Sequence, residues 1–209
     1  MNTGDILPIL VLLTVAGEFA VPWMLRYRYP GYDSKTMVMS VLGSPESPVR
    51  RIYNAWLIWL GVILLCSAAV LYSDVSAEYP VSGLIRSLLL GIFAVGAGIL
   101  SGLFSVNESR ENITAASRIH GAGSALGFTA LLFLPLTDGI LAVLQKNARI
   151  AVPDFTAFMG AILFFVLFIL GDKEQFRHTV CAWEGLWERL TLACMYVPLC
   201  LRSIESLLN

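Results

Sequence analysis

Long runs of apolar residues, separated by short polar stretches, set the pattern of this 209-residue chain. A helix of about 20 apolar residues crosses the roughly 30 Å hydrocarbon core of a bilayer. Six runs of this kind cover residues 6–25, 52–72, 81–106, 120–144, 155–170 and 186–208. They are too long and too continuous for the strands of a membrane barrel, which alternate over about 10 residues. The pattern therefore predicts an all-α, polytopic integral membrane six-helix bundle, with residues 1–209 forming a single transmembrane domain.

Composition supports the membrane assignment. The chain is 57% hydrophobic and 14% charged, with a mean hydropathy of +0.74, whereas soluble domains carry about 25% charged residues. The net charge of −1, without a basic or acidic tail, gives no reason to expect a nucleic-acid partner. The four cysteines lack CxxC spacing, so neither a metal site nor a disulfide framework is predicted. No cofactor can be assigned or excluded from the sequence, and the partners that it indicates are membrane lipids.

Lysine and arginine are distributed unevenly between the two predicted faces. Ten lie in or beside the first, third and fifth connections, and four lie on the other side (Arg86, Lys146, Arg149 and Arg202). Because positive charge favours the cytoplasmic side, we expect a multi-pass protein of the cell (inner) membrane with both termini extracytoplasmic. All five tryptophans fall on the predicted cytoplasmic face, as an interfacial aromatic belt or as the lining of a cavity in that leaflet.

Three short motifs, in order along the chain, carry a family resemblance. The first is Ser40-Val41-Leu42-Gly43-Ser44-Pro45 with Tyr53-Asn54, the second is Arg118-Ile119-His120-Gly121, and the third is Gly185-Leu186-Trp187-Glu188-Arg189. Together they resemble the signatures of domain-of-unknown-function family 998, with Tyr53 where phenylalanine is usual. The resemblance implies a six-span membrane protein, distantly similar to the Frag/DRAM/Sfk group, and it implies no particular reaction.

Charged residues within the spans require partners, because a charge near the bilayer centre costs at least about 2.5–3.5 kcal/mol. Glu18 and Arg189 lie at similar depths, so an ion pair between the first and last helices is expected. A proton, substrate or ion site at Glu18, or extension to the interface, is the alternative. Arg86 and Asp138 lie towards the extracytoplasmic ends of the third and fourth spans, which are consecutive and antiparallel. The two side chains either pair with one another or, for Arg86, extend to water. Pro135 and Asp138-Gly139 predict a kink or break in the fourth span.

The residues around His120 allow two interpretations. With His178, Glu184 and Glu188 it could form a catalytic or metal-binding cluster at the cytoplasmic face, although no ligand spacing such as HExxH supports a metal. Alternatively, Arg118 pairs with Glu184 or Glu188 and His120 caps the helix through a hydrogen bond. The candidate catalytic residues are thus His120, His178, Glu184 and Glu188. The candidate binding residues are Glu18, Asn54, Arg118, Arg189, Trp183 and Trp187, and no metal ligands are assigned.

Two GxxxG motifs, Gly98–Gly102 and Gly123–Gly127, lie in neighbouring antiparallel spans. Small residues allow helices to approach closely in lipid, so the two motifs are expected to face one another, with a lipid-facing groove or a homo-oligomer contact as alternatives.

Three classes of function remain open from the sequence. The favoured class is a non-catalytic, lipid-associated scaffold, sensor or assembly factor. A membrane-embedded, lipid-active enzyme using the His120 cluster would require His120, His178 and Glu188 to converge at one cavity. A small transporter using Glu18 would require a polar path to that residue, and the chain lacks the inverted repeat typical of transporters.

Overall fold

The computed structural model describes residues 6–75, 77–106 and 114–208, and all regular structure in these ranges is helical. Arg110, one of the cations used to predict orientation, lies outside them. Six segments of the described chain are long and apolar enough to cross a membrane, which confirms the all-α membrane bundle. The main helices are α1 (Ile6–Leu25), α2 (Arg50–Val75), α3 (Pro80–Phe93), α5 (Ala115–Leu132), α6 (Leu134–Leu144), α7 (Ala148–Gly171), α8 (Glu184–Met195) and α9 (Val197–Leu208).

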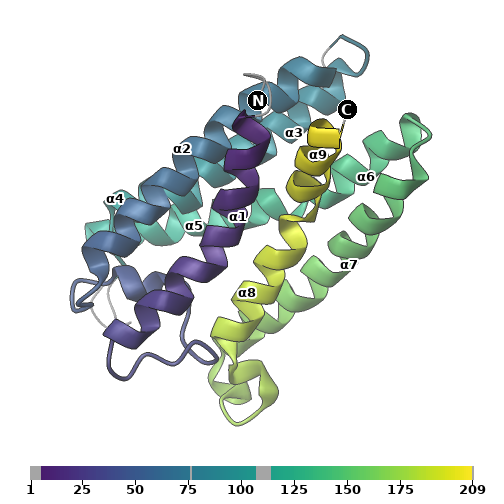
Figure 1. The fold of residues 1–209 in the computed structure, drawn as a ribbon. Coiled ribbons are helices and arrows are strands. Elements are labelled where there is room, and N and C mark those ends of the chain that lie inside the picture. The colour runs from purple at the N-terminus through teal and green to yellow at the C-terminus, as the bar shows by residue number, and fades with distance from the viewer. Residues whose placement is uncertain (1–5, 76, 107–113, 209) are drawn as a thin grey trace.

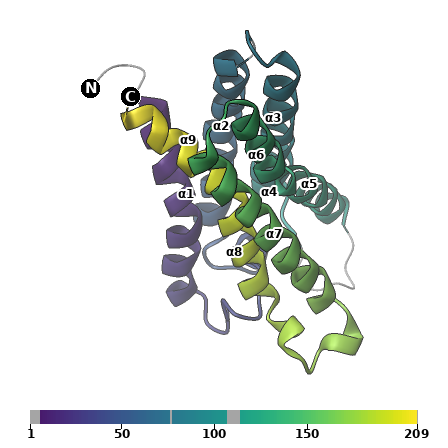
Figure 2. The same cartoon turned by 90° about the vertical axis from the view of Figure 1, so that its right-hand side faces the viewer.

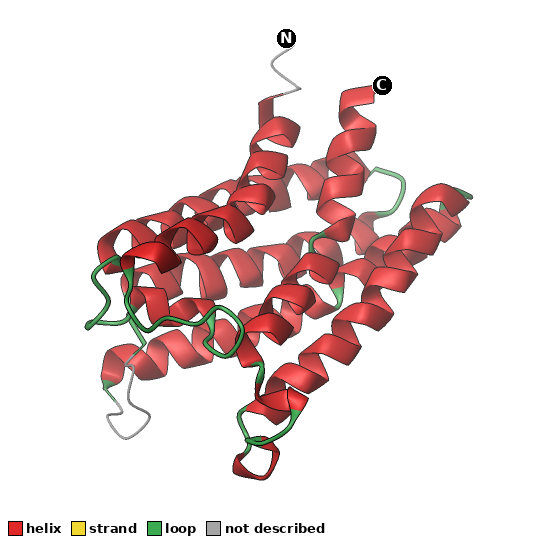
Figure 3. Ribbon diagram, turned by 60° about the horizontal axis from the view of Figure 1, so that its bottom comes forward, coloured by secondary structure: helices red, strands yellow, loops and turns green. Residues whose placement is uncertain are grey.

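The two ends of the bundle differ in their connections. The start of α1, the end of α9 and the turns after α2 and α6 lie at one end, called here the termini end (Figure 1). The long first connection, residues 26–49, lies at the opposite end with the connection between α7 and α8, and this end is called the first-loop end. Figure 3 shows that helices cross the bundle and that the longer loops lie at its ends.

Three of the six spans are not continuous α-helices. The third span passes from α3 through a π-helical segment, η4 (Ala94–Leu100), into α4 (Ser101–Leu103). The fourth span breaks at Phe133, just before Pro135, as predicted, because proline supplies no N–H to the helical ladder. The sixth span breaks at Tyr196, two residues before Pro198. Figure 2 shows α5 leaving the line of α6 at a steep angle, away from α7.

Two helices begin five or more residues before their hydrophobic runs. The fourth span begins at Ala115 because Thr114 caps it: the Thr114 hydroxyl accepts from the Ser117 N–H, and the Ser117 hydroxyl accepts from the Thr114 N–H. The fifth span begins at Ala148, seven residues before the predicted start, and contains Pro153. Asp154, which lies just outside the predicted span, is buried in the second turn of α7.

Close packing at glycines joins the third span to both of its neighbours. A Cβ added to Gly123 of α5 would lie 2.9 Å from the Gly96 carbonyl oxygen, and one added to Gly98 would lie 2.6 Å from the Gly61 Cα in α2. The prediction that the two GxxxG motifs face one another is therefore wrong. Gly123 packs against η4, while Gly98 and Gly102 pack against α2. The third span needs small residues on two sides because it lies between α2 and α5.

Candidate functional site: an acidic cavity at the first-loop end

A cavity of about 680 Å³ lies between α5 and the pair α7 and α8, with α1, α2 and the third span forming its inner wall. Most of its lining is apolar, including Leu57, Leu60, Phe93, Phe128, Phe165 and Phe168. Its volume is within the roughly 300–1,000 Å³ range of small-molecule sites. Its lining includes Val38 and Ser40 of the first connection, His120 near the start of α5 and Asp172 just after α7. These residues lie at the first-loop end, so the polar part of the cavity is at that end.

The charged residues of the cavity wall are acidic. Glu18, Asp172, Glu184 and Glu188 all line it, together with His120. Among the described residues of the lining there is no lysine or arginine. A cavity with carboxylates at one end and aromatic and aliphatic side chains along its length is chemically amphiphilic.

Glu18 is held in place by the indole of Trp56. Its side chain is 4% exposed, and Trp56 Nε1 donates to Glu18 Oε2 at 2.8 Å. Gly17 makes this contact possible, because a Cβ at that position would collide with the Trp56 ring. Within the described chain, Glu18 Oε1 makes no hydrogen bond, so one carboxyl oxygen is available to a ligand.

Glu188 connects the cavity wall to the first connection. The N–H of Met39, the first residue of the 3₁₀ helix η3 (Met39–Gly43), donates to Glu188 Oε2 at 2.6 Å. Met39 and Leu42 are buried and hold η3 against the bundle. Oε1 of Glu188 makes no hydrogen bond within the described residues.

Arg189 holds the first connection against α8. Its guanidinium donates to the Ser34 carbonyl at 2.9 Å, the Gly185 carbonyl at 2.6 Å and the Tyr32 hydroxyl at 2.8 Å. Burial raises the pKa of Tyr32 to about 12, so its hydroxyl stays protonated and can donate to the Val38 carbonyl. The predicted Glu18–Arg189 ion pair is wrong in the described structure, since each residue has other partners.

His120 acts as an anchor for the end of the third span. Its Nδ1 lies 2.9 Å from the carbonyl oxygen of Phe104, the residue that ends α4. Its ring is buried and lines the cavity. The Ser101 hydroxyl, also in the wall, lies 2.9 Å from that of Ser124. These contacts tie α4 to α5 and fix the side of the cavity opposite α8.

The other predicted site residues lie outside the cavity lining. His178 and Arg118 are exposed. Glu188, one of the two carboxylates considered as a partner of Arg118, accepts a hydrogen bond from Met39. Asn54 donates to Ser105 at 3.2 Å, Trp187 donates to the Val180 carbonyl, and Lys35 lies 3.6 Å from the Trp183 ring centroid.

Of the four candidate catalytic residues, the structure brings His120, Glu184 and Glu188 to one cavity, and His178 lies outside it. No three His, Cys, Asp or Glu residues in the described ranges are placed to hold a metal ion.

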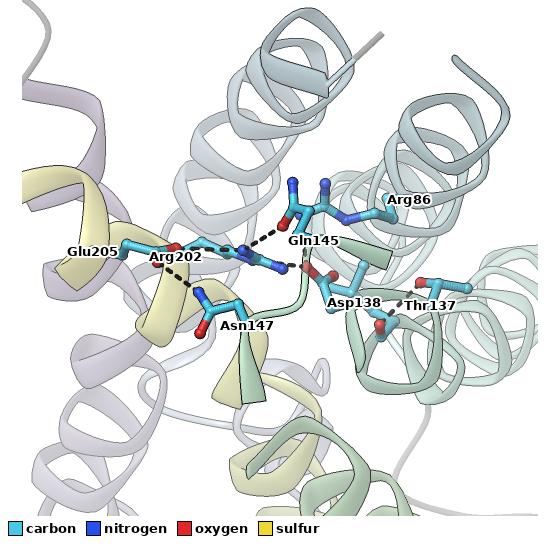
Figure 4. Close-up of polar contacts among 8 residues, drawn as sticks. Arg86, Thr137, Asp138, Gln145, Asn147, Arg202 and Glu205 are labelled. Atoms are coloured by element: carbon cyan, nitrogen blue, oxygen red, sulfur yellow. Dashed lines mark hydrogen bonds and ion pairs between the residues drawn. The ribbon is translucent and has the colours of Figure 1, made fainter. Parts of the chain in front are cut away.

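A second buried polar region lies at the termini end (Figure 4). Arg86 Nη2 of α3 lies 2.6 Å from Asp138 Oδ1 of α6, and the two side chains are 2% and 1% exposed. Arg202 of α9 lies between carboxylates, 3.3 Å from Asp138 and 3.3 Å from Glu205. Asn147 donates to Glu205 at 3.0 Å. Of the two expected alternatives, Arg86 therefore pairs with Asp138, and the pair belongs to a larger network.

The family model described as protein of unknown function (DUF998) matches residues 12–204. The chain belongs to this family. No curated protein and no solved structure matches it. The three motifs noted in the sequence lie at the first-loop end in this family member: η3 and Gly43 pack beside Asn54, His120 begins the cavity side of α5, and Gly185 to Arg189 hold the first connection.

The sequence suggested a cavity only as an alternative, with tryptophans in its wall, and none of the five tryptophans lines the cavity found. Most of the second network was not predicted. The cavity depends on the angle at which α5 leaves α6, which no local pattern encodes. Arg202, Glu205 and Asn147 join Asp138 from segments distant in sequence. Asp154 carried a usable signal, because a carboxylate beside a long apolar run is costly if the helix extends around it, but the predicted fifth span began only at Phe155.

Proposed function

We propose that this family member is a non-catalytic, lipid-associated membrane protein that binds an amphiphilic molecule in the cavity. The polar head, positively charged, lies against Glu18, Glu184 and Glu188, and the hydrocarbon chain lies along Leu57, Phe93 and Phe165. The supporting observation is the lining itself, in which acidic groups at one end continue into an apolar wall. We place it in the cell (inner) membrane with the first-loop end in the cytoplasm, an orientation that the distribution of lysine and arginine supports.

The chemistry of the wall favours a cationic head group. Two buried carboxylates, Glu18 and Glu188, are each held by one neutral N–H donor. Arg189 is the cation next to Glu188 in the sequence. Its guanidinium points towards the first connection, where it donates to the Ser34 carbonyl. Buried charges require compensation, and an ammonium group bound between these carboxylates would supply it through charge-assisted hydrogen bonds.

Binding of matched single-chain amphiphiles to the purified full-length protein tests this proposal. Dodecylamine, dodecanol and dodecanoic acid share a chain and differ in head charge, and native mass spectrometry reports their binding. We expect dodecylamine to bind best. Glu18→Gln and Glu188→Gln should each weaken it about tenfold, or about 1.4 kcal/mol, because glutamine keeps an acceptor but loses the charge. Glu46→Gln, an exposed carboxylate outside the cavity, should leave binding unchanged.

A steric pair of variants tests the location of the site. Ala125 lines the cavity, whereas Ala122, one turn earlier on the same helix, does not. Ala125→Trp should abolish dodecylamine binding, and Ala122→Trp should preserve it. Equal binding of all three amphiphiles, or equal effects of the two tryptophans, would refute the proposal.

A further inference from the structure

Asp154 is the most unusual ionisable residue of the termini end. It lies in the second turn of α7, its side chain is fully buried, and neither carboxyl oxygen has a hydrogen-bond partner in the described part of the chain. The charges that act on it are those of Asp138, Arg202 and Arg86, which come from three other helices. An ionised carboxylate buried without a partner costs several kcal/mol, and such groups normally become neutral instead.

A count of charges in the network leads to the same conclusion. Two guanidinium groups, Arg86 and Arg202, already face two carboxylates, Asp138 and Glu205. A negative charge on Asp154 would be the unmatched fifth charge of the group. A neutral Asp154 keeps the network balanced in the arrangement observed.

The network also holds spare hydrogen-bond donors for the other charge state. Arg202 Nη2 and Arg86 Nε are buried and have no hydrogen-bond partner in the described ranges. If Asp154 loses its proton, Arg202 can turn towards it and release part of its contact with Asp138, which Arg86 still pairs. Two arrangements of the same side chains would thus correspond to two protonation states.

A pocket borders this network at the termini end. It has a volume of about 380 Å³, lies between α1, α2 and α9, and has Arg202 in its wall, with hydroxyl groups from Ser67, Ser203 and Ser206. These hydroxyl groups could carry protons to the Arg202 side of the network.

We propose that Asp154 is a proton-binding site, at which binding and release of a proton exchange Arg202 between Asp138 and Asp154. A proton fits better than a metal ion because two guanidinium groups lie in the same network, and no three suitable ligands of the described chain meet there. The other charged side chains at the start of α7, Lys146 and Arg149, are exposed. Cys200 of α9 packs against the hydrophobic core, and Cys194 of α8 packs at Gly160. His120 and the charged side chains of α5 and α8 belong to the first-loop end. This site is separate from the proposed amphiphile cavity.

Two measurements on the full-length protein in detergent micelles test the site. Infrared difference spectroscopy across a pH titration should show the carbonyl band of a protonated carboxylic acid that disappears as the pH rises. Other buried carboxyl groups, such as Glu18 and Glu188, can contribute to this band, so the Asp154 signal is the part that Asp154→Asn removes. Glu174→Gln, at an exposed residue, should leave the whole band unchanged. A band that is identical in wild-type protein and Asp154→Asn, or an Asp154 component that sodium ions remove at constant pH, would overturn the proposal.

The second measurement needs no variant. Dicyclohexylcarbodiimide reacts with protonated carboxyl groups in apolar surroundings, and peptide mass spectrometry locates the adduct. We expect Asp154 to be modified in wild-type protein, with a rate that falls as the pH rises, and Asp138 to be spared. Modification of Asp138 in preference to Asp154, or a rate independent of pH, would contradict the assignment.

Discussion

The two buried polar regions of the bundle satisfy their charges in different ways. At the termini end, Arg86 and Arg202 bond directly to Asp138, and these contacts join α3, α6 and α9. At the first-loop end, Glu18 and Glu188 receive only neutral N–H donors and face a cavity of about 680 Å³. The first arrangement fastens helices together. The second leaves charge directed at a space where a ligand fits.

The largest expected effect comes from breaking the fastening network. Arg86→Leu would leave Asp138 buried with only the longer 3.3 Å contact to Arg202, so we expect a loss of about 3–5 kcal/mol in the free energy of unfolding. Denaturant unfolding in mixed micelles measures it. The double variant Arg86→Leu with Asp138→Leu should recover much of the loss, because no unpaired charge remains.

Arg177→Leu provides the matched control. Arg177 pairs with Glu174 at 2.8 Å, but both side chains are more than half exposed, so the loss should stay below about 1 kcal/mol. Equal costs for Arg86→Leu and Arg177→Leu would show that the buried network does not fasten the bundle.

The glycine contact between η4 and α5 gives the next effect, because it fixes the side of the cavity formed by α5. Gly123→Ala places a methyl group against the Gly96 backbone, and we expect a loss of about 1–3 kcal/mol. Gly121→Ala, two residues away in the same helix, meets nothing within 4 Å. It should be neutral, or stabilising by up to about 1 kcal/mol. Thermal unfolding of the two variants side by side measures the difference, and similar results would argue against close packing there.

The two ends of the bundle were not equally predictable from sequence. Hydropathy alone gives the six helices, because lipid requires long apolar segments with internally satisfied backbones. The Arg86–Asp138 pair was predictable because the two spans are consecutive and antiparallel. Glu18 was correctly marked as needing a partner, but the partner is Trp56, since the choice between Trp56 and Arg189 depends on side-chain geometry at Gly17. The cavity arises from the break at Phe133, whose angle the sequence does not specify.

A smaller effect tests how Glu18 is held. Trp56→Phe keeps the aromatic ring but removes the Nε1 donor, leaving a buried carboxylate without its 2.8 Å hydrogen bond. We expect a loss of about 1–3 kcal/mol in the free energy of unfolding. Trp59→Phe, whose ring is 48% exposed, should change it by less than about 0.5 kcal/mol. Equal losses in the two tryptophan variants would show that the Trp56–Glu18 hydrogen bond does not contribute measurably to the free energy of unfolding.

The smallest effect concerns the first connection. Hydrogen bonds from the Lys35 N–H and the Thr36 hydroxyl lower the pKa of Asp33 below its usual value of 3.8. The ionised form therefore stabilises the fold above the unfolded-state pKa, and this contribution is lost as the pH falls through the lowered value. Because Asp33 is exposed, Asp33→Asn should cost roughly a few tenths of a kcal/mol at neutral pH. Unfolding curves recorded from neutral to acid pH should converge for the two proteins.

Lipid analysis of the protein as purified from its native membrane tests the central claim most directly. Mass spectrometry should find an amphiphile with a cationic head group retained by wild-type protein and by Ala122→Trp, and lost from Ala125→Trp. Retention of the same lipids by all three proteins would show that the cavity at the first-loop end is not a binding site.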